Sequence, residues 1–261
     1  MKPDAWMVGC LARTVKKVGK VNKVNEKQIY INVGNSRISA GYFKGGKLFL
    51  LGSWPSLPAE VKKIKINKNG CERIILASVV PGISRLLKKK YPGRVCEIKN
   101  KDVPVKNLYR DKESVGVDRL LACLGALKKY KRSCVVVDFG TATTLNLITK
   151  NGEFKGGIIA PGAGMFSDYL YEKTSKLPGV TLKPVKRAIG KSTDECIGAG
   201  IFFGNLEMVG GLIRRVKKEV KGKIFTAATG GWGSFFFRFI KEIDIYDPGL
   251  VFYGMRSIKG K

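Results

Sequence analysis

Two short segments of this 261-residue chain share one pattern, in which a polar residue, an apolar residue and a glycine are followed by two small residues. They are residues 31–36, Ile-Asn-Val-Gly-Asn-Ser, and residues 137–142, Val-Asp-Phe-Gly-Thr-Ala. Each lies between two strand-like runs, as in a β-hairpin. A glycine lets backbone N–H groups approach phosphate oxygens, and a neighbouring Ser, Thr or Asn adds a neutral donor. The repeat therefore predicts two similar lobes with phosphate-binding turns.

A third glycine turn, at residues 228–233, follows a predicted strand and precedes a predicted helix. It offers close backbone approach and a helix N-terminus, so an adenosine group could lie there. Taken singly, a glycine between two strands is more often an ordinary turn. Three such turns in this order favour a nucleotide site.

Hydrophobic periodicity predicts a mixed α/β chain with a basic N-terminal extension at residues 1–28, a first lobe at 29–131 and a second at 132–261. The extension could be a flexible arm, a docking helix or a dispensable upstream start. Strands are expected at 27–34, 36–43, 47–54, 72–80, 95–100, 134–140, 143–149, 154–162 and 223–231, and helices at 83–91, 118–131, 164–174, 193–220 and 233–242.

The residues that are missing restrict the chemistry. The chain has no histidine, which excludes Ser-His-Asp and Cys-His mechanisms, so acid–base work must fall to carboxylates. The cysteines form no Cys-x-x-Cys pair and are mostly within apolar runs, which favours reduced, buried thiols. They are Cys10, Cys71, Cys96, Cys123, Cys134 and Cys196.

The formal charge of +29 would attract polyanions, so a nucleic-acid partner is one interpretation. The lysines, however, are spread along the whole chain and form no DNA- or RNA-reading motif, which favours a solvated basic surface. Charged residues, glycines and prolines interrupt the apolar runs, so no membrane span is expected. The N-terminal segment has the reverse order of a secretory signal, and a cytoplasmic location is expected.

A specific combination of motifs runs through both lobes. Gly-Val-Asp-Arg at 116–119 precedes Asp-Phe-Gly-Thr-Ala-Thr-Thr at 138–144, and Gly-Gly-Ile-Ile-Ala-Pro-Gly follows at 156–162. In order, spacing and residue type, residues 29–258 resemble the type III pantothenate kinases, which belong to the superfamily of sugar kinases, heat-shock chaperones and actin. The other matching residues are 32–37, 77–81, 107–109, Thr174, 177–178, 189–190, Thr193 and 229–231.

The resemblance implies two ribonuclease H-like domains of the actin-like ATPase type, with mixed sheets and a nucleotide cleft between them. It also implies transfer of the ATP γ-phosphate to pantothenate, which gives 4'-phosphopantothenate and begins coenzyme A biosynthesis. Asp118 would be the general base, consistent with the need of a hydroxyl nucleophile for a proton acceptor. The alternative for Asp118 and Arg119 is a pair that only caps the following helix.

The same resemblance implies the remaining roles. Asp138 would hold a monovalent cation, potassium or ammonium, and Mg²⁺ would arrive with ATP. The chain is expected to form a homodimer with the acceptor site near its interface. Pantothenate would be bound by Tyr109, Gly116, Val117, Asp118, Arg119 and Thr193, and ATP by Asn32, Val33, Gly34, Asn35, Ser36, Arg37, Ile38, Ser39, Thr141, Gly230 and Gly231.

Two positions depart from the family pattern. The family's first turn begins with aspartate, where this chain has Asn32, and Arg37 replaces a small or polar residue. An amide accepts a hydrogen bond from metal-bound water but supplies no negative charge, so a reduced rate is expected. This departure and the basic charge leave a second interpretation, a catalytically weak ATP-binding or nucleic-acid-binding regulator with the same fold.

Overall fold

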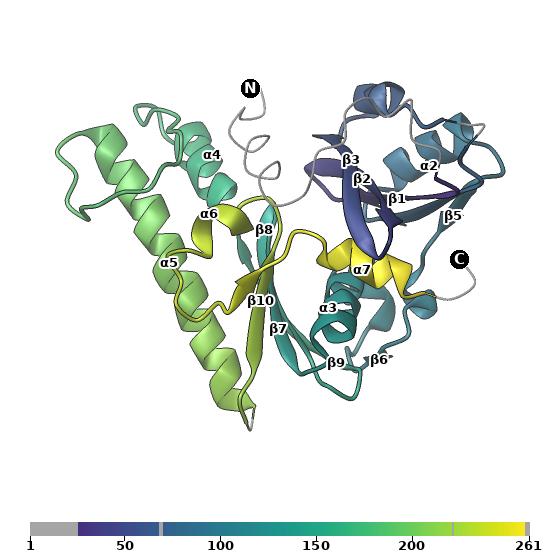
Figure 1. The fold of residues 1–261 in the computed structure, drawn as a ribbon. Helices are drawn as coiled ribbons and strands as arrows, with labels where there is room; N and C mark the ends of the chain where they lie inside the picture. The colour runs from purple at the N-terminus through teal and green to yellow at the C-terminus, as the bar shows by residue number, and fades with distance from the viewer. Residues whose placement is uncertain (1–25, 68–69, 221, 259–261) are drawn as a thin grey trace.

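The computed structural model describes residues 26–67, 70–220 and 222–258. They form two mixed β-sheets, with one layer of helices between the sheets and further helices on both outer faces (Figure 1). The predicted α/β class with two mixed sheets is confirmed. Most of the predicted extension, up to residue 25, lies outside the described residues, and Gln28 already belongs to the first strand.

The first sheet has the strand order β3-β2-β1-β4-β5. Its first three strands form an antiparallel meander, and β4 and β5 then add in parallel beside β1. The strands are β1 (Gln28–Val33), β2 (Arg37–Lys44), β3 (Lys47–Pro55), β4 (Arg73–Ser78) and β5 (Val95–Glu97).

The second sheet repeats this arrangement. Strands β7, β8 and β9 form an antiparallel meander, β10 and β11 add in parallel beside β7, and β6 pairs with the far edge of β9. The internal repeat in the sequence therefore corresponds to a structural repeat. The strands are β6 (Lys106–Asn107), β7 (Cys134–Phe139), β8 (Ala142–Ile148), β9 (Glu153–Pro161), β10 (Phe225–Thr229) and β11 (Ile245–Tyr246).

Helices α3 (Val117–Tyr130) and α7 (Leu250–Arg256) lie side by side between the sheets (Figure 1). Their backbones touch, because a Cβ on Gly125 would overlap the Leu250 carbonyl and one on Gly254 would overlap the Leu121 carbonyl. The apolar residues of both helices share one core with the inward-facing residues of both sheets. This core fixes the start of α3 relative to both glycine turns.

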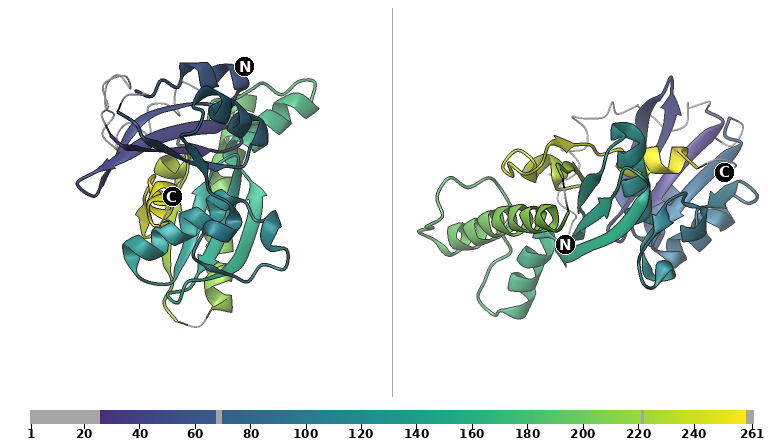
Figure 2. Two further views of the ribbon diagram at one scale, coloured as in Figure 1. Left: turned by 90° about the vertical axis from the view of Figure 1, so that its right-hand side faces the viewer. Right: turned by 90° about the horizontal axis from the view of Figure 1, so that it is seen from below.

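The outer faces of the two sheets have separate apolar cores, and α2 and α5 lie at opposite ends of the molecule (Figure 1 and Figure 2). On the first sheet the cover is α2 (Pro81–Lys90) and the 3₁₀ helix η2 (Pro58–Lys63). The outer face of the second sheet is covered by α4 (Ala163–Lys173), α5 (Thr193–Glu219) and α6 (Gly233–Phe236). Two short 3₁₀ helices, η3 (Asn100–Asp102) and η4 (Lys112–Ser114), precede α3 in the chain.

Strand alternation places polar residues on the inner faces of both sheets. Successive side chains of a strand point to opposite faces. In β1, Tyr30 belongs to the central core, so Asn32, two residues later, faces inward. In β7, Val136 belongs to the same core, so Asp138 also faces inward. The two polar residues that begin the glycine turns therefore face the space between the sheets.

Several expectations need correction. The helix expected at 233–242 ends at Phe236, where the backbone tightens into a turn in which Phe239 N–H donates to the Phe236 carbonyl oxygen at 2.9 Å. Strand β6 lies at residues 106–107, where no strand was expected, and pairs with the second sheet. Cys196 is exposed, whereas Cys71, Cys123 and Cys134 are buried as expected, and Cys10 lies outside the described residues.

Helix α5 is more apolar than the sequence interpretation allowed. Among the described residues it is the one helix long and apolar enough to cross a membrane by length and composition, with a mean hydropathy of 1.6 over its best window. Its buried residues, including Ile197, Phe202 and Ile213, pack on the outer face of the second sheet. Burial in a protein core accounts for these residues as well as a membrane would.

Candidate active site

The two glycine turns touch each other. Ser36 follows β1 and Thr141 follows β7, and their hydroxyl oxygens lie 2.6 Å apart in a hydrogen bond. The first turn is closed by Gly34 N–H, which donates to the Arg37 carbonyl oxygen at 2.9 Å. Ser36 and Thr141 are exposed, so both hydroxyls can reach a ligand between the turns.

The other predicted ATP residues of the first turn have different environments. Val33 and Ile38 are fully buried in the outer core of the first sheet, so only their backbone can face a phosphate. Arg37 donates through Nε to Ser53 Oγ at 2.9 Å, and burial lowers the pKa of its guanidinium. Asn32 Oδ1 is buried without a hydrogen-bond partner among the described residues.

Asp138 lies in the second turn, beside the third. A Cβ on Gly230 would overlap Asp138 Oδ1, and Gly230 has a φ of +86°, so both space and backbone conformation require glycine there. Burial, and secondly the negative charge of Asp118, raises the pKa of Asp138 to about 7. Asp138 of the second turn therefore lies against Gly230 of the third turn and is affected by the charge of Asp118, the predicted base.

Asp118 lies in the first turn of α3, where Gly116 is the N-cap residue. Its Oδ1 accepts a hydrogen bond from Arg119 N–H at 2.8 Å within the first turn, but the helix has no side-chain cap at Gly116. Burial raises the pKa of Asp118, while this N–H group and the Arg119 guanidinium oppose the shift. Since Asp118 also acts electrostatically on Asp138, capping does not account for its whole environment.

Arg119 is held by residues that the sequence interpretation partly missed. Its Nε donates to Asn146 Oδ1 at 2.8 Å, and its guanidinium lies 5.7 Å from the Tyr109 ring centre and 5.8 Å from that of Phe154. Arg119 Nη2 is buried and has no partner among the described residues. Asn146 could have been noticed as the polar residue within the apolar strand Leu-Asn-Leu-Ile at 145–148.

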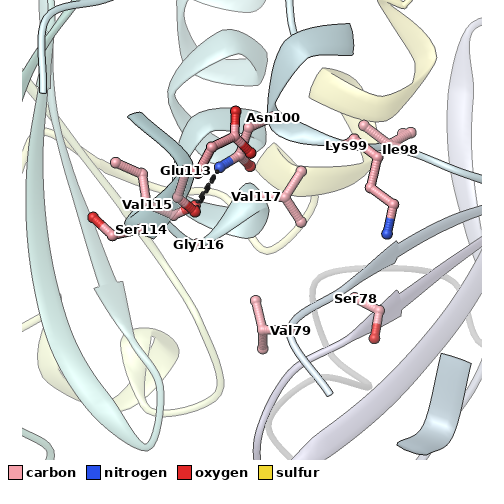
Figure 3. A pocket seen from close by; sticks show the side chains of 10 residues that line it. All are labelled: Ser78, Val79, Ile98, Lys99, Asn100, Glu113, Ser114, Val115, Gly116 and Val117. Carbon is pink, nitrogen blue, oxygen red and sulfur yellow. Dashed lines mark hydrogen bonds between the residues drawn. The ribbon is translucent and has the colours of Figure 1, made fainter. Parts of the chain in front are cut away.

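A pocket of about 300 Å³ opens beside the start of α3 (Figure 3). Gly116 and Val117 form one side, and Ser78 and Val79, at the C-terminal end of β4, lie across from them. The side-chain amide of Asn100 donates to the Val115 carbonyl oxygen at 2.8 Å and so fixes the approach to α3. This volume suits a small acceptor molecule. The remaining lining residues are Ile98, Lys99, Asn100, Glu113, Ser114 and Val115.

Thr193 stands apart from the other predicted substrate residues. It is the exposed first residue of α5, a helix that packs on the outer face of the second sheet, whereas α3 packs on the inner face. Within the described residues, no hydrogen bond joins its hydroxyl to Tyr109, Gly116, Val117 or Arg119. Within a single chain, Thr193 is therefore separated from the other predicted acceptor residues.

The site lacks a preformed divalent-metal cage. In the described part of the chain, no group of three or more Cys, Asp or Glu side chains is placed to hold a metal ion. The unpartnered Asn32 Oδ1 fits a role as an acceptor for metal-bound water. The carboxyl of Asp138 lies beside the Gly230 turn and is a ligand type that cations bind.

Comparison with known proteins gives a consistent result. Residues 28–215 match the protein family described as type III pantothenate kinase. A relative from Methylacidiphilum infernorum, named type III pantothenate kinase, is 34% identical over 236 residues, which cover 88% of this chain and 87% of the relative.

Solved structures of lower sequence identity share the fold. A Campylobacter jejuni protein described as a Baf family transcriptional activator superposes with a TM-score of 0.59 at 22% identity, covering 88% of this chain and 96% of that one. A Sinorhizobium meliloti protein described as a 2-dehydro-3-deoxygalactonokinase gives 0.51 at 10% identity, covering 88% and 97%. The expected two-lobed actin-like ATPase fold is confirmed.

Proposed function

Because the chain belongs to the type III pantothenate kinase family, we propose that its two glycine turns, Asp118 and Asp138 form the active site of an ATP-dependent pantothenate kinase. The chain is a phosphotransferase of coenzyme A biosynthesis. One observation carries the site assignment: the charge of Asp118 acts on Asp138, which lies in the turn whose Thr141 contacts Ser36.

Asp118 is the general base in this proposal. Its carboxylate accepts the proton of the primary hydroxyl of pantothenate as that oxygen attacks the γ-phosphorus of ATP. The N-terminal end of α3 favours a negative charge and opposes the burial that raises the pKa of Asp118. The raised pKa makes this carboxylate a stronger base than a free aspartate.

The glycine turns bind the nucleotide. Ser36 and Thr141 exchange their mutual hydrogen bond for bonds to phosphate oxygens, and Gly34 supplies close backbone approach. Asn32 would accept a hydrogen bond from a water of the Mg²⁺ that arrives with ATP, and the metal would supply positive charge that stabilises the transferred phosphoryl group. Asp138 holds the monovalent cation, potassium or ammonium, which adds positive charge beside the transferred phosphoryl group. Gly230 and Gly231 border the adenosine.

The acceptor lies beside the start of α3. Arg119, with its buried unpartnered Nη2, binds the pantothenate carboxylate, and Tyr109 packs against the same guanidinium. Gly116 and Val117, which directly precede Asp118 in the chain, line the pocket. These contacts position the acceptor hydroxyl for the base.

A homodimer accounts for the exposed residues of the second lobe. Helix α4 exposes Met165, Phe166, Tyr169 and Tyr171 and contacts α5, which begins at the exposed Thr193. Apolar side chains gathered on one surface are typical of a protein interface. A second copy of this chain would cover α4 and bring its Thr193 towards the acceptor site.

The basic surface supports a second candidate function, a nucleic-acid-binding regulator, but less strongly than the site supports a kinase. Its charge of +29 would bind nucleic acid at low salt, as a regulator would. Binding of random duplex DNA that persists at physiological salt would favour that function, whereas loss of binding above roughly 200 mM salt indicates diffuse attraction. We place the kinase in the cytoplasm, where ATP and its acceptor are available.

The proposal is tested by ATP turnover with Mg²⁺ and potassium, with and without pantothenate. Asp118→Asn should lower kcat by about 100- to 10,000-fold while ATP still binds. Asp111→Asn, the same change at an exposed position whose Oδ1 accepts the Glu113 N–H, is the matched control. Pantothenate-independent ADP release in the wild type, or an active Asp118→Asn variant, would overturn the assignment.

A further inference from the structure

Asn146 holds the Arg119 side chain by a hydrogen-bond chain with a fixed direction. Arginine can only donate, so the Asn146 oxygen must face Nε, at 2.8 Å. The amide nitrogen then donates to Thr144 Oγ1 at 3.0 Å, two residues earlier on the same face of β8. Asn146 is 1% exposed, so water does not compete for either bond. The amide therefore sets the orientation of the guanidinium.

The positive charge of Arg119 has no ion-pair partner within 4.0 Å among the residues that the structure describes. Two aromatic rings, Tyr109 and Phe154, flank the guanidinium, and its Nη2 is buried without a hydrogen bond. Asp118 acts on it electrostatically from the start of the same helix. A buried cation in this state binds an incoming anion strongly.

We propose that Asn146 is a positioning residue that sets the charge preference of the acceptor site. A neutral amide orients Arg119 without neutralising it, so the cation and its free Nη2 remain for the carboxylate of the acceptor. This inference rests on the proposed pantothenate kinase function and on Arg119 binding that carboxylate. It assigns the preference for an anionic acceptor to a residue that acts on the acceptor only through Arg119.

A carboxylate in place of the amide would have the opposite effect. It would form a charge-assisted pair with the guanidinium at the same position and compete with the acceptor. The enzyme would lose affinity for pantothenate but keep its geometry at Asp118 and at the glycine turns. The change should therefore appear in KM for pantothenate, with little change in kcat.

The test compares pantothenate with its neutral primary-amide analogue as acceptors in the wild type and in Asn146→Asp. The variant should raise KM for pantothenate at least about tenfold, with kcat changed less than about threefold, and the preference for pantothenate over the amide should fall about tenfold. Loss of packing alone would not change this preference. Asn151→Asp, in the exposed turn between β8 and β9, adds the same charge away from Arg119 as a control.

Asn146→Ser provides a second variant with a neutral side chain. It still tests the role of Asn146 if Asn146→Asp does not fold. It should raise KM for pantothenate because Arg119 is less well oriented, and it should retain the preference for the anion. If Asn146→Asp leaves the preference for pantothenate over the amide unchanged, or if Asn146→Ser leaves KM for pantothenate unchanged, the inference is overturned. The proposed kinase function is not affected by either result. A wild type that phosphorylates neither acceptor overturns the proposed function, and the inference with it.

Discussion

The hydroxyl oxygens of Ser36 and Thr141 lie 2.6 Å apart, although 105 positions separate the two residues in the chain. Each hydroxyl follows the glycine turn of a different sheet, so this one hydrogen bond marks the place where the two repeated lobes meet. A ligand that enters between the turns must replace it. The contact therefore links the internal repeat of the sequence to nucleotide binding.

Replacement of Ser36 by alanine should weaken ATP binding. It removes one neutral donor to a phosphate oxygen, and a hydrogen bond to a charged group contributes about 1.5–3 kcal/mol, so we expect KM for ATP to rise roughly tenfold or more. Initial rates at varied ATP concentration give this value. Ser175→Ala, at an exposed position, should leave KM for ATP unchanged.

Asn32→Asp should raise kcat at saturating Mg²⁺. Asn32 Oδ1 is buried without a partner in the described residues, and a carboxylate there would orient metal-bound water more strongly than the amide does. The increase should be about 3- to 30-fold, measured as kcat across a Mg²⁺ titration. An equal or lower kcat would show that this chain works as well with the amide.

Gly230→Ala should lower kcat in addition to destabilising the fold through backbone strain. Gly230 and Gly93 both have positive φ, +86° and +72°, but only at Gly230 would a Cβ overlap Asp138 Oδ1. A positive φ costs a non-glycine residue about 1–2 kcal/mol, so both variants should unfold at a lower temperature. Only Gly230→Ala should also lower kcat, by at least about tenfold, in the presence of potassium. Equal activity in both variants would contradict the placement of Asp138.

Asp138→Asn should stabilise the ligand-free protein above neutral pH. Because the pKa of Asp138 is raised to about 7, its stabilising contribution is fully present below the unfolded pKa and is lost as the pH rises through 7. In buffer without potassium or ammonium, the Asn variant should therefore melt above the wild type at pH 8. The difference should shrink towards pH 4. Thermal unfolding across this range, with Asp111→Asn as control, measures it.

Tyr169→Lys should dissociate the proposed dimer. Tyr169 on α4 is 64% exposed, and a lysine there would place a charge in an apolar interface. The dimer dissociation constant should rise at least about tenfold, as measured by sedimentation. Leu57→Lys, at a position 57% exposed on the other lobe, is the matched control. An unchanged constant would exclude α4 from the interface.

The fold could be predicted from local patterns where a pattern matches one element. Alternating apolar residues gave β1, β7 and β8, and helical spacing gave α3 and α5. Strands β6 and β11, of two residues each, carry no periodic signal and exist because a neighbouring strand edge accepts them. The segment at 233–242 has helical spacing, but the backbone leaves the helix at Phe236 in a tight turn closed by the Phe239 N–H, which the spacing does not encode.

The site could be predicted only where chemistry is local. Asp118 and Asp138 were identified by their motifs, and the structure describes an electrostatic interaction between them. Asn146 was missed because its role depends on Arg119, which is 27 positions away. Val33 and Ile38 were predicted to contact ATP, but strand alternation buries their side chains in the outer core.

The sequence by itself determined the repeated sheets, the glycine turns and the identity of the groups that can accept a proton, because strand periodicity, the small size of glycine and the absence of histidine are local properties. Only the tertiary structure decided which of these groups act on one another. The folded chain brings the charge of Asp118 to act on Asp138 and partly buries both residues, and this burial, which no local pattern encodes, raises the pKa of each carboxyl.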